Sequence, residues 1–487
     1  MHSERDYNAA VLSLNSLQSN FSAVEAIRKQ GPGWNQRALP EMRSWPSDFD
    51  QLNLIHVAGT KGKGSTSSFI SSILAQYLPT AKSVHAERLP TSVGLYTSPH
   101  LRFVRERVQI DGQPISEQQF ARYFWEVWDR LEATSPANEE HEARNVSGKP
   151  VYFHYLTLMA LHCYMQEKVG TAVIECGIGG EYDTTNILEK PLTTCVTSLG
   201  IDHVAMLGDT IESIAWHKAG IFKPGVPAFT VPQPEQALAI LHERAQQTGT
   251  ELRVVDEHPA LAHMKLGLHG DFQRINASLA IAICTSHLSR LGYIAANSTC
   301  DQAFELPEEF IKGLETVHLG GRCETRQDTA LKGLTWPMVC DCHYERPGRI
   351  ESPHLQPTDP RRTGACPTFA RHPYISPESD RPFQHAIFCT NTTYKGAGYK
   401  ADLVSMNTSK DDVDSLRVQR ELAHAYDEID PEAKVHVLGT IEEAVVRARE
   451  LAGGNTAEVL VTGSLHLVGG LIEVLESEAE RAQESRS

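Results

Sequence analysis

Short apolar runs alternate with longer segments of helical period along the first 300 residues of the chain. The runs contain many β-branched residues and have the length of strands, while the longer segments have the length of helices. Strands are predicted at 52–58, 171–176 and 193–199, and helices at 151–168 and 233–247. This alternation is typical of a doubly wound α/β domain on a parallel sheet, which we place at residues 1–300.

A second, smaller α/β domain is predicted over residues 301–487. It follows a stretch at 297–325 that the pattern predicts to be loop. Residues 337–385 are crowded with Pro, Arg, His and Ser and have no sustained period, so they are either a disordered insertion or a divergent segment. Strands of this domain are predicted at 386–390, 435–438 and 458–462, with helices between them.

A glycine-rich loop joins the first predicted strand to a helical period that runs from Phe69 to Leu78. Glycines let backbone N–H groups turn toward a polyanion, and lysines and hydroxyls add charge and hydrogen bonds. A surface turn could carry the same string, but the strand before it and the helix after it favour a nucleotide phosphate site. The candidate ATP-binding residues are Gly59, Thr60, Lys61, Gly62, Lys63, Gly64 and Ser65.

Composition narrows the function classes. With 45 Lys and Arg against 61 Asp and Glu, the formal charge of −16 argues against a general nucleic-acid binder. The chain lacks the roughly 18 to 20 consecutive apolar residues of a membrane span, and its mean hydropathy is −0.31.

No secretory signal is predicted, so a cytoplasmic location is expected, with a mitochondrial pool left open. Ten scattered cysteines are expected to be reduced, and Cys340, Cys342 and His343 lack the second ligand pair of a zinc site.

Four further residues are candidates for ligand binding, and two of them stand at the ends of predicted strands, where open α/β sheets bind ligands. Ser98 lies on a proline-containing loop, Glu175 ends one strand, His203 follows the next, and Lys218 lies on a short helical stretch. Each alone could be structural. Together, oxygen and imidazole groups beside a phosphate loop suit Mg²⁺ with ATP.

In chain order, these segments resemble the folylpolyglutamate synthase family in its eukaryotic, fungal-like form. The motifs that carry the resemblance lie at 56–66, 97–101, 175–186, 200–208, 217–223, 270–277, 318–322, 388–391 and 461–470. The resemblance implies a P-loop, Mur-ligase-like ATPase domain that also binds folate, and a smaller C-terminal Rossmann-like ligase domain. It also implies ATP and Mg²⁺ as cofactors, with a monovalent cation such as K⁺ as a further candidate.

The resemblance implies roles for individual residues. The family's metal ligands match Ser98, Glu175 and His203, and the lysine that is carbamylated in the superfamily matches Lys218. Asn276 and Arg322 match positions that contact ATP, and the loop at 98–107 lies by the folate. Lys218, Lys63 and His203 are the expected catalytic residues.

One motif departs from the family pattern. After residue 336 the family has a strand that ends in Asp-Gly-Ala-His, whereas this chain places Asp341 and His343 in a different spacing without the glycine. Asp341 is the candidate for the family's aspartate beside ATP. A wrong splice junction and true divergence would give the same sequence here.

The expected activity is an ATP-dependent ligation of L-glutamate to the γ-carboxylate of (tetrahydro)folate polyglutamates through an acyl phosphate. Two alternatives stay open at this point. The chain could be a catalytically impaired nucleotide- or folate-binding paralogue, which the departure at Asp341 favours, or a dihydrofolate synthase that acts on dihydropteroate. Reduced folates and L-glutamate are the expected substrates, and the chain is expected to be a monomer.

Overall fold

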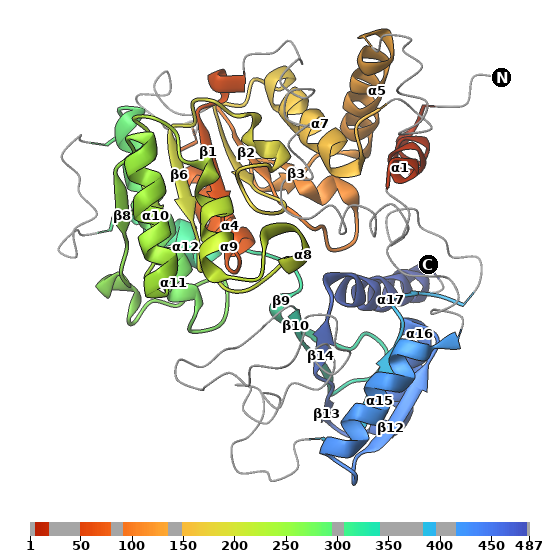
Figure 1. Ribbon diagram of the computed structural model, residues 1–487. Coiled ribbons are helices and arrows are strands. Elements are labelled where there is room, and N and C mark those ends of the chain that lie inside the picture. Colours follow the sequence, from red (N-terminus) through yellow and green to blue (C-terminus); the bar gives the residue numbers. More distant parts are fainter. Residues whose placement is uncertain are drawn as a thin grey trace. The chain divides into compact units, whose positions relative to one another are not determined.

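The computed structural model describes most of the chain, in seven stretches, and divides it into two compact units (Figure 1). The N-terminal unit comprises Met1–His100 and Val104–Leu319, and the C-terminal unit comprises Leu101–Phe103 and Gly320–Ser487. The described residues are 5–18, 49–78, 91–134, 149–294, 306–340, 383–395 and 415–484. No helix among them is long and apolar enough to cross a membrane.

An eight-stranded sheet forms the centre of the described N-terminal unit, in the order β4-β3-β2-β5-β1-β6-β7-β8. From β2 to β8 neighbouring strands are parallel, and β3 and β4 extend the sheet in antiparallel pairing. The strands are β1 Leu54–Ala58, β2 Val93–Tyr96, β3 Val108–Ile110, β4 Gln113–Pro114, β5 Thr171–Glu175, β6 Thr193–Val196, β7 Ala228–Thr230 and β8 Leu252–Val254. The predicted strands at 52–58, 171–176 and 193–199 are confirmed with shorter bounds.

Helices cover both faces of this sheet (Figure 1). One apolar cluster joins the strands to α4, α11 and α12, and another joins them to α9 and α10. The helices are α1 Tyr7–Ser16, α4 Lys63–Ala75, α5 Glu117–Thr134, α7 Tyr152–Gln166, α8 Val204–Leu207, α9 Ile211–Lys218, α10 Glu235–Thr248, α11 Gln273–Arg290 and α12 Glu308–Thr316. Single 3₁₀ turns lie at Phe49–Leu52, Val104–Arg107, Thr184–Ile187, Ala219–Ile221 and Pro259–Leu261. The predicted doubly wound α/β fold is thus confirmed.

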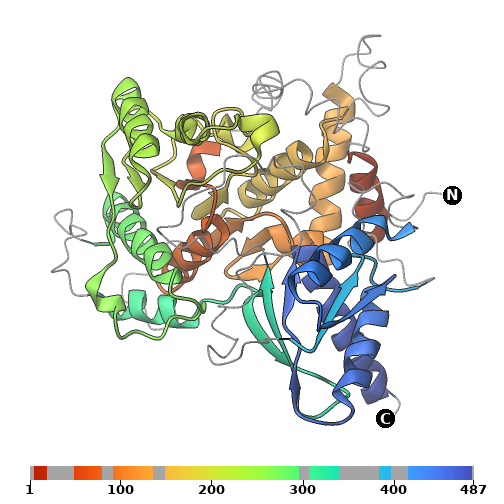
Figure 2. The ribbon, with the colours of Figure 1, turned by 60° about the horizontal axis from the view of Figure 1, so that its bottom comes forward.

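The described C-terminal unit is also α/β (Figure 2). Strand β10 pairs in parallel with β13 and β14 on one edge and antiparallel with β9 on the other, while β11 and β12 form a separate parallel pair. Its elements are β9 Arg322–Gln327, β10 Leu334–Cys340, β11 His385–Cys389, α15 Arg417–Ile429, β12 Lys434–Leu438, α16 Ile441–Ala452, β13 Ala457–Glu458, β14 Val461–Gly463 and α17 Leu465–Glu484. The single strand predicted at 458–462 is therefore two short strands.

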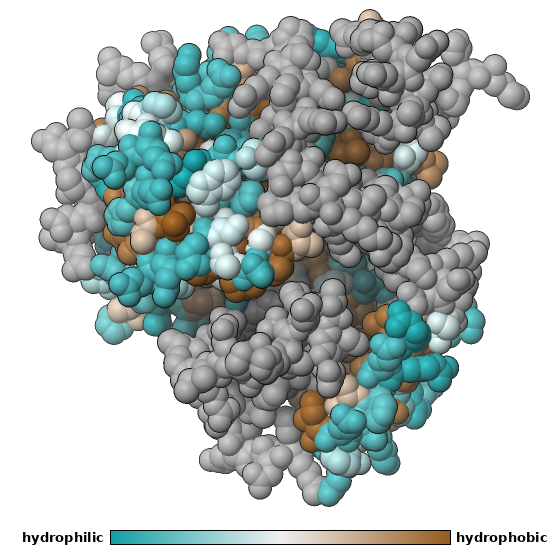
Figure 3. Space-filling model, in the orientation of Figure 1, coloured by the Kyte–Doolittle hydropathy of each residue, from teal (hydrophilic) through white to brown (hydrophobic). Residues whose placement is uncertain are grey.

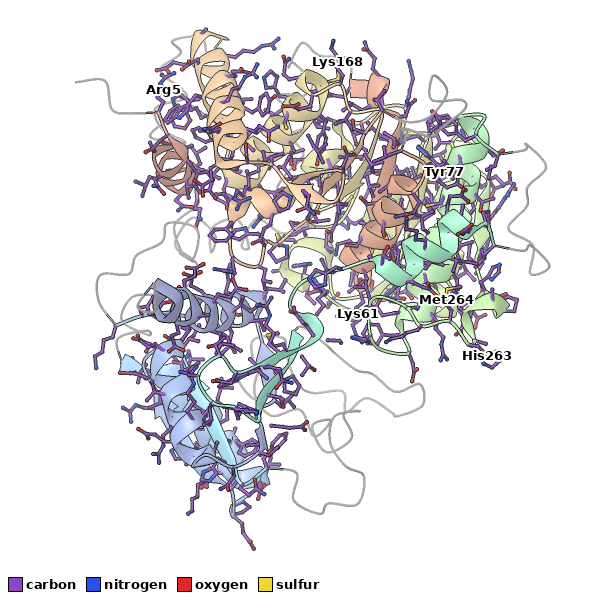
Figure 4. All side chains as sticks on the ribbon, turned by 180° about the vertical axis from the view of Figure 1, so that it is seen from behind. Arg5, Lys61, Tyr77, Lys168, His263 and Met264 are labelled. Atoms are coloured by element: carbon purple, nitrogen blue, oxygen red, sulfur yellow. The ribbon has the colours of Figure 1, made fainter. Side chains whose placement is uncertain are left out.

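The prediction of a loop at 297–325 is wrong within residues 306–325, the part that the structure describes. Helix α12 lies within it, because Phe310 and Leu314 are four residues apart and both bury fully in the core. Gly313 lets the helix approach α4 closely, since a Cβ there would lie 2.6 Å from the Cα of Ile73. Tyr77, labelled in Figure 4, meets Phe310 edge to face at 6.1 Å.

The irregular stretch predicted at 337–385 is wrong at both ends, because β10 continues to Cys340 and β11 begins at His385. Pro337 is tolerated inside β10 for a simple reason. The parallel partners on one edge stop opposite Thr335 and resume opposite Met338, so the missing N–H of Pro337 falls in the gap between β13 and β14. Residues 341–382, with Asp341, lie outside the described residues.

Candidate functional site

The loop between β1 and α4 has a backbone that only glycine fits at two positions. Gly59 has φ +146°, and a Cβ there would lie 1.8 Å from the Oγ1 of Thr197. Gly62 has φ +87°, and a Cβ there would lie 2.3 Å from the Oδ1 of Asn276. The loop is therefore closely packed against β6 and α11, and its shape depends on both glycines. Figure 4 labels Lys61 on this loop.

Helix α4 begins at Lys63 directly after the loop. Its N-cap residue is Gly62, which has no side chain with which to cap the helix. The first intrahelical hydrogen bond runs from the N–H of Thr66 to the carbonyl of Gly62, at 2.8 Å. The N–H groups of Lys63, Gly64 and Ser65 precede it, so together with the helix dipole they form a site suited to an anion.

The carboxylate of Glu175 lies beside this helix start. Glu175 ends β5 and is only 3% exposed. Its Oε2 accepts the N–H of Ser98 at 3.1 Å, and a Cβ on Gly64 would lie 3.7 Å from the same oxygen. The structure therefore brings together Ser98, Glu175 and the phosphate loop.

Lys218, the last residue of α9, is 2% exposed and donates from Nζ to the carbonyl of Gly59 at 2.7 Å. Burial, with the positive charge of Lys63 as a second cause, lowers the pKa of Lys218 to about 7. A large fraction of this lysine is therefore a neutral amine at neutral pH, which is the nucleophilic form.

His203 precedes α8 with a left-handed backbone, at φ 51°. The backbone N–H of His203 donates to Oδ1 of Asp202 at 2.7 Å. Burial lowers the pKa of His203, and the charges of Lys218 and Lys63 lower it further against the opposing effect of Asp202. A neutral imidazole, the form that binds metals, is therefore favoured.

Asn276 lies on α11 against the loop, as the Gly62 geometry requires. Its Nδ2 donates to Oε1 of Gln273 at 2.9 Å, and Nε2 of Gln273 donates to Oγ of Ser65 at 3.3 Å. Gln273 is almost fully buried and was not among the predicted site residues. Its only signal in the sequence was its place inside the motif at 270–277. Arg322, the first residue of β9, belongs to the C-terminal unit.

A buried polar network that the sequence did not reveal lies around β1. Nε2 of His56 is 2.8 Å from Oγ1 of Thr185 and 3.1 Å from Sγ of Cys176. The carboxylate of Asp183 accepts the N–H and the hydroxyl of Thr185. Burial lowers the pKa of His56 to about 3 and raises the pKa of Asp183. The imidazole is therefore neutral, and it supports β1 three residues before the loop begins at Gly59.

Comparison with known proteins decides the family. No family model matches the sequence. Folylpolyglutamate synthase of Saccharomyces cerevisiae strain FostersO is 43% identical over 495 residues, which cover 97% of this chain and 87% of the yeast protein. The chain belongs to the folylpolyglutamate synthase family. The synthase of yeast strain S288c is likewise 43% identical, over 497 residues.

Solved structures of folylpolyglutamate synthases share the fold. The apo form of the L. casei protein matches with a TM-score of 0.63 at 21% identity and covers 94% of this chain and 100% of that one. The Mycobacterium tuberculosis synthase complexed with ADP and AMPPCP matches with a TM-score of 0.62 at 22% identity, over 96% and 99% of the two chains. The predicted family and its two-domain Mur ligase fold are confirmed.

Proposed function

We propose that the chain is an ATP-dependent ligase that adds L-glutamate to the γ-carboxylate of reduced folates and their polyglutamates. The observation that carries the proposal is the glycine-dependent loop at the start of α4, beside the buried Glu175, in a member of the folylpolyglutamate synthase family. An L. casei synthase has been solved as an AMPPCP complex and as an AMPPCP and folate complex. These complexes support ATP and folate as the ligands of this chain.

The predicted ATP residues fit this role. Lys63 at the first position of α4 would neutralise charge on the γ-phosphate, and the loop and helix N–H groups would hold the phosphates. Gly59, Thr60, Lys61, Gly62, Gly64 and Ser65 would shape the loop, and Asn276 would contact the nucleotide. The ATP contact expected of Arg322 stays a prediction. The aspartate role expected of Asp341 stays a prediction.

Two of the predicted ligands, Ser98 and Glu175, offer oxygen atoms, which Mg²⁺ prefers as a hard cation. Glu175 offers a buried carboxylate whose position is set by the N–H of Ser98, and the lowered pKa of His203 keeps its imidazole neutral. Ser98 and Glu175 lie together, and they would hold the ion with His203 and a carbamylated Lys218 as the family resemblance implies. The part of the chain that the structure describes contains no cluster of three or more His, Cys, Asp or Glu side chains that could hold a metal. When bound, the ion would neutralise charge on the transferring phosphoryl group.

Carbamylation of Lys218 is chemically reasonable at this position. The neutral amine attacks CO₂, an N–C bond forms, and one proton leaves to give an anionic carbamate. The pKa of about 7 makes the neutral amine available at physiological pH. The change would place an anion at a buried position beside the phosphate loop, where a metal could balance the charge.

The reaction follows from the chemistry of the substrates. An oxygen of the folate γ-carboxylate attacks the γ-phosphorus of ATP, the bond to the bridging oxygen breaks, and ADP leaves. The amine of L-glutamate, after losing a proton, attacks the acyl phosphate carbonyl, and phosphate leaves as the amide forms. The chain contributes by holding the phosphates at α4 and neutralising charge with Lys63, the part of phosphoryl transfer where a protein has most effect.

The purified chain, given ATP, Mg²⁺, tetrahydrofolate and L-glutamate, tests the proposal. We expect folate products extended by glutamate, with ADP released in step. ATP binding without glutamate-dependent ADP release would instead support the impaired paralogue. Turnover with dihydropteroate in place of tetrahydrofolate would support dihydrofolate synthase. We further propose that the enzyme acts as a monomer in the cytoplasm, which gel filtration and fractionation would test.

A further inference from the structure

The side chain of Gln233 bridges two backbone positions after β6, residues 197 and 199. Its Oε1 accepts the N–H of Leu199 at 2.9 Å, and its Nε2 donates to the carbonyl of Thr197 at 3.0 Å. Nε2 also donates to Oγ1 of Thr230, at 3.0 Å. One amide therefore holds the residues on both sides of Ser198, which sets the direction in which the carbonyl of Ser198 points.

The carbonyl of Ser198 supports the phosphate loop. It accepts the N–H of Thr60 and the N–H of Lys61, both at 3.0 Å. The hydroxyl of Thr60 adds a contact to the next residue of the same segment, donating to the carbonyl of Gly200 at 3.1 Å. Both loop amides therefore bond to Ser198, the hydroxyl of Thr60 bonds to Gly200, and the direction of the two amides defines the curvature of the loop.

The same segment also limits the loop sterically. Oγ1 of Thr197 lies against Gly59, where a Cβ would be only 1.8 Å away. The carbonyl of Gly59 in turn accepts Nζ of Lys218. A movement of residues 197–199 would therefore change both the hydrogen bonds and the packing of the loop, and a displacement of about 1 Å is enough to weaken a positioned phosphate contact strongly.

We propose that Gln233 is a positioning residue for the ATP-binding loop. It contacts no residue of the loop itself in the described hydrogen bonds and acts through Thr197, Ser198 and Leu199. Removing the amide would free the carbonyl of Ser198 to rotate, and the N–H groups of Thr60 and Lys61 would lose their fixed acceptor. The inference rests on the proposed function in one respect, the assignment of ATP to this loop.

The test compares three variants of the full-length chain. Gln233→Leu removes all three hydrogen bonds at nearly constant volume. Thr230→Val removes the hydroxyl that donates to the carbonyl of Val196 at 2.8 Å and accepts from Gln233, but leaves the bonds to Thr197 and Leu199. It therefore perturbs the same place without releasing Ser198. Gln247→Leu is the residue-matched control, because the amide of Gln247 donates to the carboxylate of Glu243 within α10, at 3.0 Å.

For Gln233→Leu we expect the KM for ATP and the Kd for AMPPCP to rise about tenfold, with the KM for L-glutamate within about twofold of wild type. Hydrogen exchange of the peptide that contains Thr60 and Lys61 should accelerate, while a peptide from β5 should not change. Thr230→Val and Gln247→Leu should keep wild-type ATP affinity and loop exchange.

Three results would overturn the inference. One is an unchanged KM for ATP in folded Gln233→Leu, and another is an equal rise in both KM values. The third is exchange that accelerates equally in the loop and in β5, which would indicate a general loss of stability. The exchange comparison holds even if Gln233→Leu is inactive. A wild-type chain that does not bind AMPPCP would refute the proposed function, whereas loop exchange would still report on Gln233.

Discussion

In the N-terminal unit, β1 is buried along its whole length and pairs with parallel strands on both edges, whereas in the described C-terminal unit β11 and β12 form a separate pair of mostly half-buried residues. In the C-terminal unit, β10 meets its parallel partners only in two short pieces. In the N-terminal unit, the continuous sheet places the residues after β6 so that they hold the loop between β1 and α4 by backbone hydrogen bonds. In the described C-terminal unit, contacts between charged side chains join the elements instead.

Charged side chains illustrate the difference. In the C-terminal unit the buried carboxylate of Asp328 accepts from Arg449 and from the indole of Trp336, both at 3.0 Å, and Arg449 also pairs with Glu478. Arg102 similarly pairs with Glu473 and Glu476. In the N-terminal site, by contrast, Lys218 and Glu175 contact backbone groups. Backbone groups thus position these two side chains of the N-terminal site.

The largest expected effect is at Gly62. Gly62→Ala places a Cβ 2.3 Å from Asn276 at a φ of +87°, so we expect ATP turnover to fall by at least about 100-fold. The matched C-terminal change is Gly454→Ala, at φ +82° with no heavy atom within 4 Å of the Cβ. It should cost about 1 kcal/mol in the free energy of unfolding and leave the KM for ATP unchanged. Comparable loss of turnover in both variants would contradict the assignment of the loop.

The second-largest loss of ATP turnover is expected for a change at Glu175. Glu175→Gln keeps the shape but removes the charge, so Mg²⁺-dependent ATP turnover should fall by about 100-fold with an unchanged circular dichroism spectrum. Glu478→Gln in the C-terminal unit removes one charge of a half-buried ion pair and should cost about 1 kcal/mol of stability without loss of ATP affinity. His203→Ala should behave as Glu175→Gln does. Wild-type turnover in both N-terminal variants would refute the metal assignment.

Lys218→Ala should lose at least about tenfold in activity, because the carbamate oxygens disappear. Short carboxylic acids added to this variant should restore part of the rate by supplying oxygen ligands. Lys395→Ala, which removes a lysine that is 80% exposed and pairs with Glu443, should leave the rate unchanged. Native mass spectrometry under CO₂ should show an adduct in wild type and not in Lys218→Ala. An active Lys218→Ala variant without any adduct in wild type would disprove carbamylation.

The smallest effect concerns acid stability. The folded-state pKa of His56 is about 3, well below the ordinary value near 6.5, so the unfolded chain binds more protons between these limits. The free energy of unfolding should therefore decrease as the pH is lowered below about 6.5. For this residue the decrease should be up to about 1.4 kcal/mol per pH unit. His56→Gln should flatten the dependence between pH 7 and pH 5 in urea melts. His436→Gln, at a half-buried C-terminal histidine whose pKa burial also lowers, should flatten it less. An equal change in the two slopes would contradict the contrast between the units.

The same contrast between the two units explains which elements and which site residues could be predicted from the sequence. Apolar runs mark the central strands because both faces of the N-terminal sheet are buried, and the glycine-rich loop is readable because its strand and helix are adjacent in sequence. Helix α12 was missed because only Phe310 and Leu314 mark its buried face. Gln233 and Gln273 were missed because their partners lie 34 and 208 residues away, at Leu199 and Ser65.

The most direct test is ligation by the full-length chain. With ATP, Mg²⁺, tetrahydrofolate and L-glutamate, the wild-type protein should form glutamate-extended folate and release ADP only when L-glutamate is present, and Gly62→Ala should do neither. Glutamate-extended product that persists in Gly62→Ala would contradict the account of the loop. Wild-type protein that binds AMPPCP but forms no glutamate-dependent product would contradict the ligase function.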